Sequence, residues 1–162
     1  RERKLKKGDL VFVDMGFCYK GYLSDKTQIY SYGGRPEPVA EQKHEACRRV
    51  LAAAVAMLRP GNSCQQVWQA SEAARDPLLQ ENYMGYGQAA VRFLGHGLGM
   101  QIDEAPVIMD GNKALLKEGM LIALEPKCGV QGQGLVGVEE SYLVQKNGAD
   151  CITGGDLPII RV

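Results

Sequence analysis

Apolar and polar residues alternate along two segments near the start of the chain. The run LVFV at 10–13 follows a Lys-Gly-Asp turn, and a second alternating segment extends over 22–32. A period of two is typical of half-buried strands, and the intervening glycine suits a reversal of the chain. The pattern therefore predicts a β-hairpin.

The two aspartates of this hairpin are the first candidates for a functional site. With Tyr19 and Lys20 at the tip, Asp14 is predicted to lie directly opposite Asp25. Side chains opposed in this way are close neighbours on one face of the sheet. Two carboxylates so close together repel each other, which calls for a cation between them or for a raised pKa.

A helical period replaces the alternation after residue 38. Apolar residues recur every three to four positions over 39–59, which predicts a helix that a Pro-Gly pair then ends. Asn62 or Ser63 caps a second predicted helix, which continues to Arg75; in the latter case Gln66 completes a capping box. Both helices are expected to serve as outer packing, and His44 on the first is expected to be a packing or surface residue.

The sequence pattern changes again at about residue 83, where short glycine-rich segments begin. The nearly continuous apolar run 120–124 predicts a strand buried on both faces. Strands are also predicted over 136–144 and 159–162. Two helices between a hairpin and several short strands predict an α+β domain, with the helices on one face of a curved sheet.

Composition narrows the function classes. A chain of 162 residues fits one domain, and 19 basic against 19 acidic residues give no net charge. We therefore expect no nucleic-acid partner and no membrane association, since no apolar stretch approaches the length of a span. The five cysteines are scattered and form no CxxC pair, which predicts reduced, buried thiols and a cytoplasmic protein.

Five residues form an ordered set of metal-ligand types. Four carboxylates and one imidazole are an oxygen-rich combination that suits hard or borderline divalent ions rather than a structural zinc site. Each alone also fits an ordinary structural role, and it is the ordered combination that is specific. Its members are Asp14, Asp25, His96 in GHGLG, Glu125 in LEP and Glu139 in VEES.

The blocks around these residues resemble a known family. LKKGDLVFVDMG…GYLSDKT, FLGHGLG…DEAP, LKEGMLIALEP and VGVEESYLV are similar, in this order, to the metal-binding blocks of the pita-bread metallohydrolases. That family includes methionine aminopeptidase, aminopeptidase P, prolidase and creatinase, and the Xaa-Pro peptidases are the most similar members. The resemblance implies a pita-bread fold with a curved antiparallel sheet.

The resemblance also implies a role for each candidate residue. Asp14 would chelate one ion, Asp25 and Glu139 would bridge two ions, and His96 with Glu125 would complete the second ion's ligands. The cofactors implied are two divalent metal ions (manganese, cobalt, iron or zinc) that share a hydroxide. Glu125 would in addition move the proton, and Asp103 is a second candidate catalytic residue.

Three departures from the family pattern qualify this expectation. Asp103 stands seven residues after His96, where the peptidases usually carry a second histidine, and Gly137 stands where prolidases often have an arginine. The chain begins with Arg1 and has no counterpart of the family's upstream half. We therefore expect residues 1–162 to be a catalytic domain that is incomplete on its N-terminal side. An incomplete sheet exposes its edge and apolar surface, which predicts a homodimer.

Three functions remain open on these grounds. The first is a dinuclear metal-dependent peptidase of the Xaa-Pro aminopeptidase or prolidase type. The second is the same metal site acting on a small non-peptide molecule, as a creatinase-like hydrolase or lyase, which the changes at Asp103 and Gly137 favour. The third is an inactive, truncated binding module.

Overall fold

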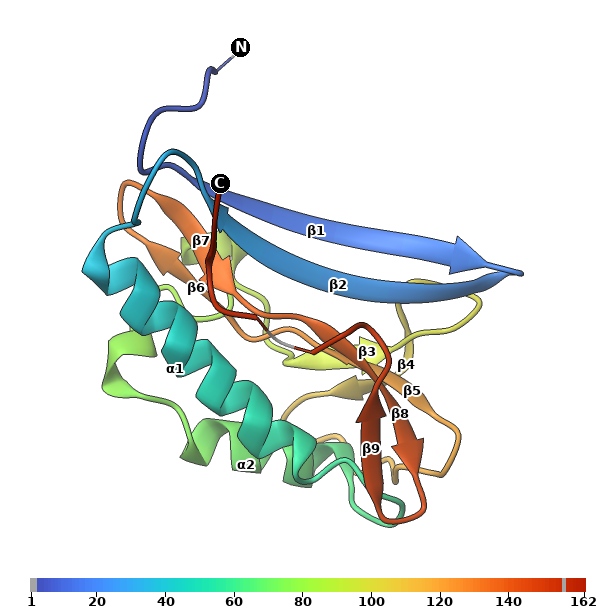
Figure 1. Cartoon of the computed structure of the whole chain (residues 1–162). Coiled ribbons are helices and arrows are strands. Elements are labelled where there is room, and N and C mark those ends of the chain that lie inside the picture. The colour runs from blue at the N-terminus through green and yellow to red at the C-terminus, as the bar shows by residue number, and fades with distance from the viewer. Residues whose placement is uncertain (1–2, 156) are drawn as a thin grey trace.

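The computed structural model describes residues 3–155 and 157–162. In it the strands and the helices pack against one another. A long hairpin lies along one side and two helices lie on the other, with the remaining strands between them (Figure 1). The strands of the described residues form three sheets, with the strand orders β1-β2-β10, β4-β3-β5-β8-β9 and β6-β7. The strands are β1 (Leu10–Tyr19), β2 (Tyr22–Ser31), β3 (Gly95–Gly97), β4 (Glu104–Ile108), β5 (Leu121–Leu124), β6 (Lys127–Val130), β7 (Gly134–Gly137), β8 (Glu140–Gln145), β9 (Gly148–Cys151) and β10 (Ile160–Arg161).

The tip of the β1–β2 hairpin lies one residue further along than its alternation suggested, which shifts the pairing register by two residues. Lys20 and Gly21 form the tip, with φ angles of 51° and 85°. Two positive φ angles are the requirement of a type I′ turn, and glycine meets it without steric cost. The predicted register is therefore wrong: Asp14 lies opposite Thr27, and Asp25 lies opposite Gly16. Because the shift is an even number of residues, both aspartates stay on the same face as diagonal neighbours.

The strand predicted over 136–144 is in fact two strands. β7 pairs with β6, whereas β8 pairs with β5, and the chain changes partner at Val138 and Glu139. Glu139 forms an isolated bridge to Thr27 of the hairpin instead of joining either sheet. The interruption brings the carboxyl-bearing residue against β2. The predicted strands at 120–124 and 159–162 are found as β5 and β10, and β10 pairs in parallel with β2.

Two α-helices cover the side of the strands away from the hairpin (Figure 1). α1 (Pro38–Val55) ends four residues before the predicted boundary, because Met57 and Leu58 make tighter bonds to carbonyls three residues back. α2 (Cys64–Ala73) begins with the capping box of Ser63 and Gln66, as predicted. Two 3₁₀ helices follow, η1 (Pro77–Leu79) and η2 (Gly87–Ala89).

The main core lies between these helices and the strands β5 and β8. Its buried members include Val50, Leu51, Ile122, Leu124 and Val144. Burying such side chains is the dominant favourable term in folding, and here it attaches the helices to the strands that carry the candidate ligands. The predicted α+β arrangement with helices on one face is confirmed.

The thiol prediction is only partly correct. All five cysteines are free; Cys47, Cys64 and Cys128 are buried, whereas Cys18 and Cys151 are exposed. His44 is buried and places Nε2 3.0 Å from the Leu157 carbonyl, which agrees with a packing role. Among the described residues, no helix combines the length and hydropathy that a membrane span requires.

Candidate metal centre

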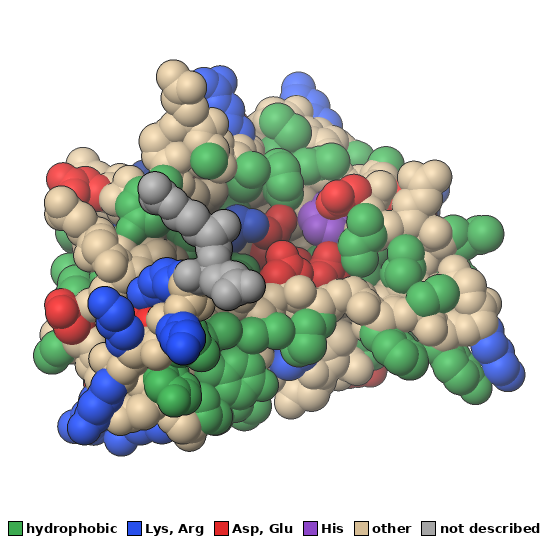
Figure 2. Space-filling view, turned by 90° about the horizontal axis from the view of Figure 1, so that it is seen from above, with side chains coloured by type: hydrophobic (Ala, Val, Ile, Leu, Met, Phe, Trp, Pro, Cys, Tyr) green, Lys and Arg blue, Asp and Glu red, His purple; other side chains and the backbone are tan. Residues whose placement is uncertain are grey.

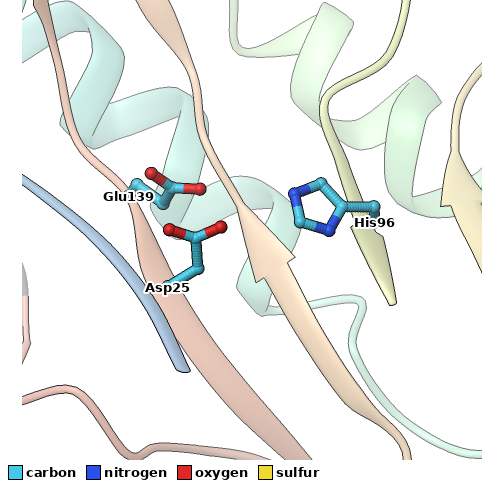
Figure 3. A group of neighbouring side chains, drawn as sticks. All are labelled: Asp25, His96 and Glu139. Atoms are coloured by element: carbon cyan, nitrogen blue, oxygen red, sulfur yellow. The ribbon is translucent and has the colours of Figure 1, made fainter. Parts of the chain in front are cut away.

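Three of the five predicted ligands meet in one buried group. Asp25 comes from β2, His96 from β3, and Glu139 from the link between β7 and β8, and their side chains point toward one another (Figure 3). One ligand atom from each lies within 4.8 Å of the others. All three side chains are buried, so bulk water screens their charges only weakly. Seen from above, acidic side chains and a histidine gather in a hollow of the surface, with a basic side chain beside them (Figure 2).

Glu125 stands next to this group. It follows β5 directly and is 9% exposed, and its Oε1 lies 3.9 Å from Nε2 of His96. Its other oxygen, Oε2, accepts a charged hydrogen bond from Nζ of Lys127. The carboxylate thus faces the imidazole with one oxygen and an ammonium group with the other.

Asp14 lies at the open side of the group. It is exposed on β1, opposite Thr27, and it is not part of the set within 4.8 Å. Its carboxylate is nevertheless close enough to raise the pKa of both Asp25 and Glu139. The structure therefore brings all five predicted ligands into one electrostatic neighbourhood, with three in direct apposition.

The short strand that carries His96 is confined between β4 and β5. A Cβ on Gly95 would lie 2.0 Å from the carbonyl oxygen of Ala123, and one on Gly97 would lie 2.5 Å from that of Ala105. Glycine is required at both positions because the neighbouring backbones occupy this space. The two glycines thus allow the backbones on either side of β3 to approach it closely.

The two nitrogens of His96 have different surroundings. Nδ1 lies 3.0 Å from the Gly97 carbonyl, while Nε2 lies 3.2 Å from Oδ1 of Asp103. A carbonyl can only accept, so Nδ1 carries a proton when this bond forms. In the neutral ring Nε2 then directs its lone pair at the oxygens of Asp103 and Glu125. A cation held by these three groups would make this arrangement favourable.

Burial and mutual repulsion disfavour the ionised forms of Asp25 and Glu139. Burial, with added repulsion from Asp14 and Glu125, raises the pKa of Asp25 from 3.8 to about 6. Burial raises the pKa of Glu139 from 4.5 to about 8, although the hydrogen bond from Thr27 opposes this shift. Both shifts express the cost of holding anions together in a place that water does not solvate.

Asp103 lies at the mouth of the group and is largely exposed, at 73%. It borders a cavity of about 400 Å³ that opens beside the imidazole. The lining combines apolar and acidic side chains, namely Phe93, His96, Asp103, Glu104, Ala105 and Val107. Asp103 can therefore contact a molecule that enters this cavity.

Three further residues support the group, and each stands two positions after a predicted ligand. Thr27 Oγ1 donates a 2.7 Å hydrogen bond to Glu139 Oε2, and Ser141 Oγ bonds to both the N–H and the C=O of Asp25. Lys127 pairs with Glu125. None of the three was predicted from the sequence. A spacing of two places Thr27 on the same face of β2 as Asp25, and it would have placed Ser141 on the same face as Glu139 in the strand predicted over 136–144.

The donor set fits a divalent cation. Three carboxylates and one imidazole nitrogen are hard and borderline donors, which bind manganese, cobalt, iron and zinc ions alike. A bound cation would also compensate the buried negative charge of Asp25 and Glu139. Metal binding is the chemistry that this arrangement of side chains serves best.

Comparison with known proteins agrees with this assignment. The chain is 36% identical over 149 residues to the probable dipeptidase PepE of Mycobacterium tuberculosis, and 32% identical over 152 residues to the Xaa-Pro dipeptidase of Pyrococcus furiosus. The alignments cover 91% and 94% of this chain but 38% and 42% of those proteins. The chain thus spans less than half the length of these curated relatives.

Solved structures show the same fold. The dipeptidase PepE from Mycobacterium ulcerans superimposes with a TM-score of 0.88 at 35% identity, covering 100% of this chain and 42% of that one. The prolidase from Pyrococcus furiosus gives 0.81 at 30% identity, covering 97% and 44%. The predicted pita-bread fold is therefore confirmed. The model of metallopeptidase family M24 matches residues 1–146, a span that covers most of the chain and contains the predicted ligand positions, and the chain belongs to that family.

Proposed function

We propose that this chain forms the metal-binding catalytic portion of a peptidase that cleaves short peptides, with Xaa-Pro dipeptides as its first expected substrates. Two divalent ions would be held by Asp14, Asp25, His96, Glu125 and Glu139. The observation that carries the proposal is the buried apposition of Asp25, His96 and Glu139 within 4.8 Å. Membership of a metallopeptidase family, and relatives named as dipeptidases, support the choice of substrate.

The proposed chemistry needs polarisation of a peptide carbonyl and an activated water. Ions bound at these ligands would supply both, as Lewis acids that lower the pKa of water. The protein's own side chains would orient the substrate and transfer protons next to the ions. Glu125, between His96 and Lys127, is proposed to accept the proton from the attacking water, and its burial keeps competing water away.

Asp103 is proposed to bind the amino end of the substrate. Its carboxylate and that of Glu104 border the 400 Å³ cavity, whose remaining lining is largely apolar. An ammonium group paired with Asp103 would direct an apolar side chain toward Phe93 and Val107. This assignment treats Asp103 as a substrate contact and not as a proton donor, since an ionised carboxylate only accepts.

The direct test combines metal titration with hydrolysis of matched dipeptides. Protein freed of metal with a chelator would be titrated with Mn²⁺ and assayed on Ala-Pro and Ala-Ala. We expect up to two ions per chain, and turnover of Ala-Pro that requires metal. A chain that binds no Mn²⁺ in this titration would contradict the metal site. Bound ions without turnover of either dipeptide would contradict the peptidase assignment alone.

A small non-peptide substrate is the second candidate. It is favoured by Asp103, which stands 3.2 Å from His96 Nε2 where the resemblance led us to expect a histidine. Such an acid suits a substrate with a cationic or strongly donating group. Turnover of amide-bearing or guanidino-bearing metabolites, with none of Ala-Pro, would select this function.

Two further expectations stay proposals. Homodimer formation is supported by exposed aromatic residues at the hairpin tip, Phe17, Tyr19 and Tyr22, and size-exclusion chromatography would test it. A reducing, cytoplasmic location is supported by five free thiols.

A further inference from the structure

A second cavity borders α2, on the side of the strands away from the hairpin (Figure 1). Its volume is about 430 Å³, which is within the range of sites for small organic molecules. Its lining comes from α2 and the turn after it, and from three segments near Tyr83, Arg92 and Met109. Within the described residues, it shares no lining residue with the cavity beside His96, so it is a separate place on the molecule.

Aromatic and aliphatic side chains line one part of this second cavity. Trp68, Tyr83 and Val91 are half-buried; they pack against the main core and also border the cavity. Met84 and Met109 complete the apolar part of the lining. Aromatic rings and thioethers make favourable contacts with other rings, so this surface suits an apolar and preferably aromatic group.

Two arginines border the cavity, and their charges differ in how they are compensated. Nη2 of Arg75 lies 3.2 Å from Oε2 of Glu72, and its Cζ lies 5.3 Å from the centroid of the Tyr83 ring. The guanidinium of Arg75 is therefore paired and held over the aromatic wall. Arg92 is exposed, and none of the ion pairs among the described residues includes it. Its planar guanidinium can bind a carboxylate through two hydrogen bonds.

Asp110 supplies a negative charge at the same cavity. Its Oδ1 accepts a 3.0 Å hydrogen bond from the N–H of Gly111. Although Asp110 and Arg92 both border the cavity, they form no ion pair with each other in the described part of the chain. A ligand that carries both a carboxylate and an ammonium group would satisfy both residues, whereas a ligand with a single charge would satisfy only one of them.

We propose that this cavity binds a free amino acid with an apolar or aromatic side chain. Arg92 binds the carboxylate, Asp110 binds the ammonium group, and Trp68 and Tyr83 contact the side chain. The inference goes beyond the proposed function, because it needs neither the metal ions nor the cavity beside His96. Hydrolysis of dipeptides would release molecules of this chemical class, but binding at this cavity does not depend on that activity.

The test titrates L-phenylalanine into the whole chain after metal has been removed with a chelator. Trp68 is the single tryptophan of the chain, so its fluorescence reports on this cavity directly, and isothermal titration calorimetry gives an independent affinity. We expect a saturable change in Trp68 emission with a dissociation constant below about 1 mM. The absence of metal separates this binding from the proposed metal centre.

Charge-removing variants assign the two ends of the ligand. Arg92→Met should weaken L-phenylalanine binding about tenfold or more, since a charged hydrogen bond to the carboxylate is lost. Arg92→Gln replaces the methionine variant should that one not fold. Asp110→Asn keeps an oxygen for the Gly111 N–H and removes the charge. It should weaken L-phenylalanine binding but leave the binding of 3-phenylpropionate, which has no ammonium group, unchanged.

Two further variants are controls for place. Arg59→Met removes the charge of an exposed arginine that does not border the cavity, and it should bind L-phenylalanine as wild type does. Asp103→Asn removes the charge beside His96 and should also leave this affinity unchanged.

Three results would overturn the inference. No saturable binding of L-phenylalanine to wild type, by fluorescence and calorimetry, would remove the site. Loss of binding in Asp103→Asn, with none in Arg92→Met, would place the ligand in the cavity beside His96. Unchanged L-phenylalanine binding in Asp110→Asn would remove the amino-acid assignment. None of these results bears on the proposed function, which the Mn²⁺ titration and the dipeptide assay decide separately.

Discussion

Thr27 and Glu139 connect two segments that are far apart in the chain. The hydroxyl of Thr27 donates a 2.7 Å hydrogen bond to Oε2 of Glu139, and the backbone N–H of Thr27 bonds to the Glu139 carbonyl at 3.3 Å. The hydroxyl contact stabilises the ionised carboxylate and opposes the rise in its pKa. A hydrogen bond of this kind also orients a metal ligand.

Removal of this hydroxyl should weaken metal binding. Thr27→Val keeps the β-branched shape but leaves Glu139 without its donor, so the pKa of Glu139 rises further and its orientation is lost. We expect Mn²⁺ affinity at pH 7 to fall by about tenfold or more. Thr27→Ser retains the hydroxyl and serves as the control. Equal affinities for the valine and serine variants, measured by calorimetry, would contradict the role given to this bond.

The stability of the metal-free protein should decrease between pH 5 and pH 9. Burial raises the pKa of Glu139 from 4.5 to about 8 and that of Asp25 from 3.8 to about 6, so the folded state holds more protons than the unfolded state in this range. Stability from these groups is complete below the unfolded pKa values and is lost as pH rises through the folded ones. Thermal unfolding in a chelator would show the decrease, and Glu139→Gln should make it smaller. A melting temperature that rises over this range in wild type and variant alike would speak against the shift.

Added metal should stabilise the fold through Glu139 but not through Glu140. Mn²⁺ at about 100 times its dissociation constant should add about 2.7 kcal/mol to the free energy of unfolding. Glu139→Gln should abolish most of this gain. Glu140→Gln is the matched control, because Glu140 pairs with Lys26 and Thr153 and lies outside the ligand group. Glu140→Gln should lower the melting temperature without metal but keep the stabilisation by Mn²⁺. Loss of this stabilisation in both variants would disprove the separate roles of Glu139 and Glu140.

Insertion of one methyl group beside His96 should damage both stability and metal binding. Gly95→Ala places a Cβ about where the Ala123 carbonyl lies, at 2.0 Å, so β3 must separate from β5. We expect a loss of at least about 2 kcal/mol in chemical denaturation and a marked loss of metal affinity. Gly148→Ala in β9 has nothing within 4 Å and should be close to neutral. Equal stability and metal affinity of the two variants would show that neither property depends on the close packing of β3 against β5.

Local signals predicted the helices well and the strands less completely. The stripe of α1 and the capping box of Ser63 and Gln66 depend on residues three or four apart, which the sequence displays directly. The single strand predicted over 136–144 divides at Glu139 because each half has a different partner, β6 or β5. A strand partner from a distant part of the chain produces no periodic pattern in the local sequence. The short strands β3 and β4 escaped prediction for the same reason.

The sequence by itself determined which side chains could bind a metal, since carboxylate and imidazole types in a fixed order identify the donor chemistry wherever they meet. Tertiary structure alone decided how they meet. A type I′ turn at Lys20 and Gly21 moved Asp14 from a position opposite Asp25 to a diagonal one, because only that tip satisfies two positive φ angles. Packing then placed Thr27 on Glu139, a contact that depends on pairing between distant segments. It also buried the carboxylate of Glu125, whose charge pairs with Lys127 two residues further along.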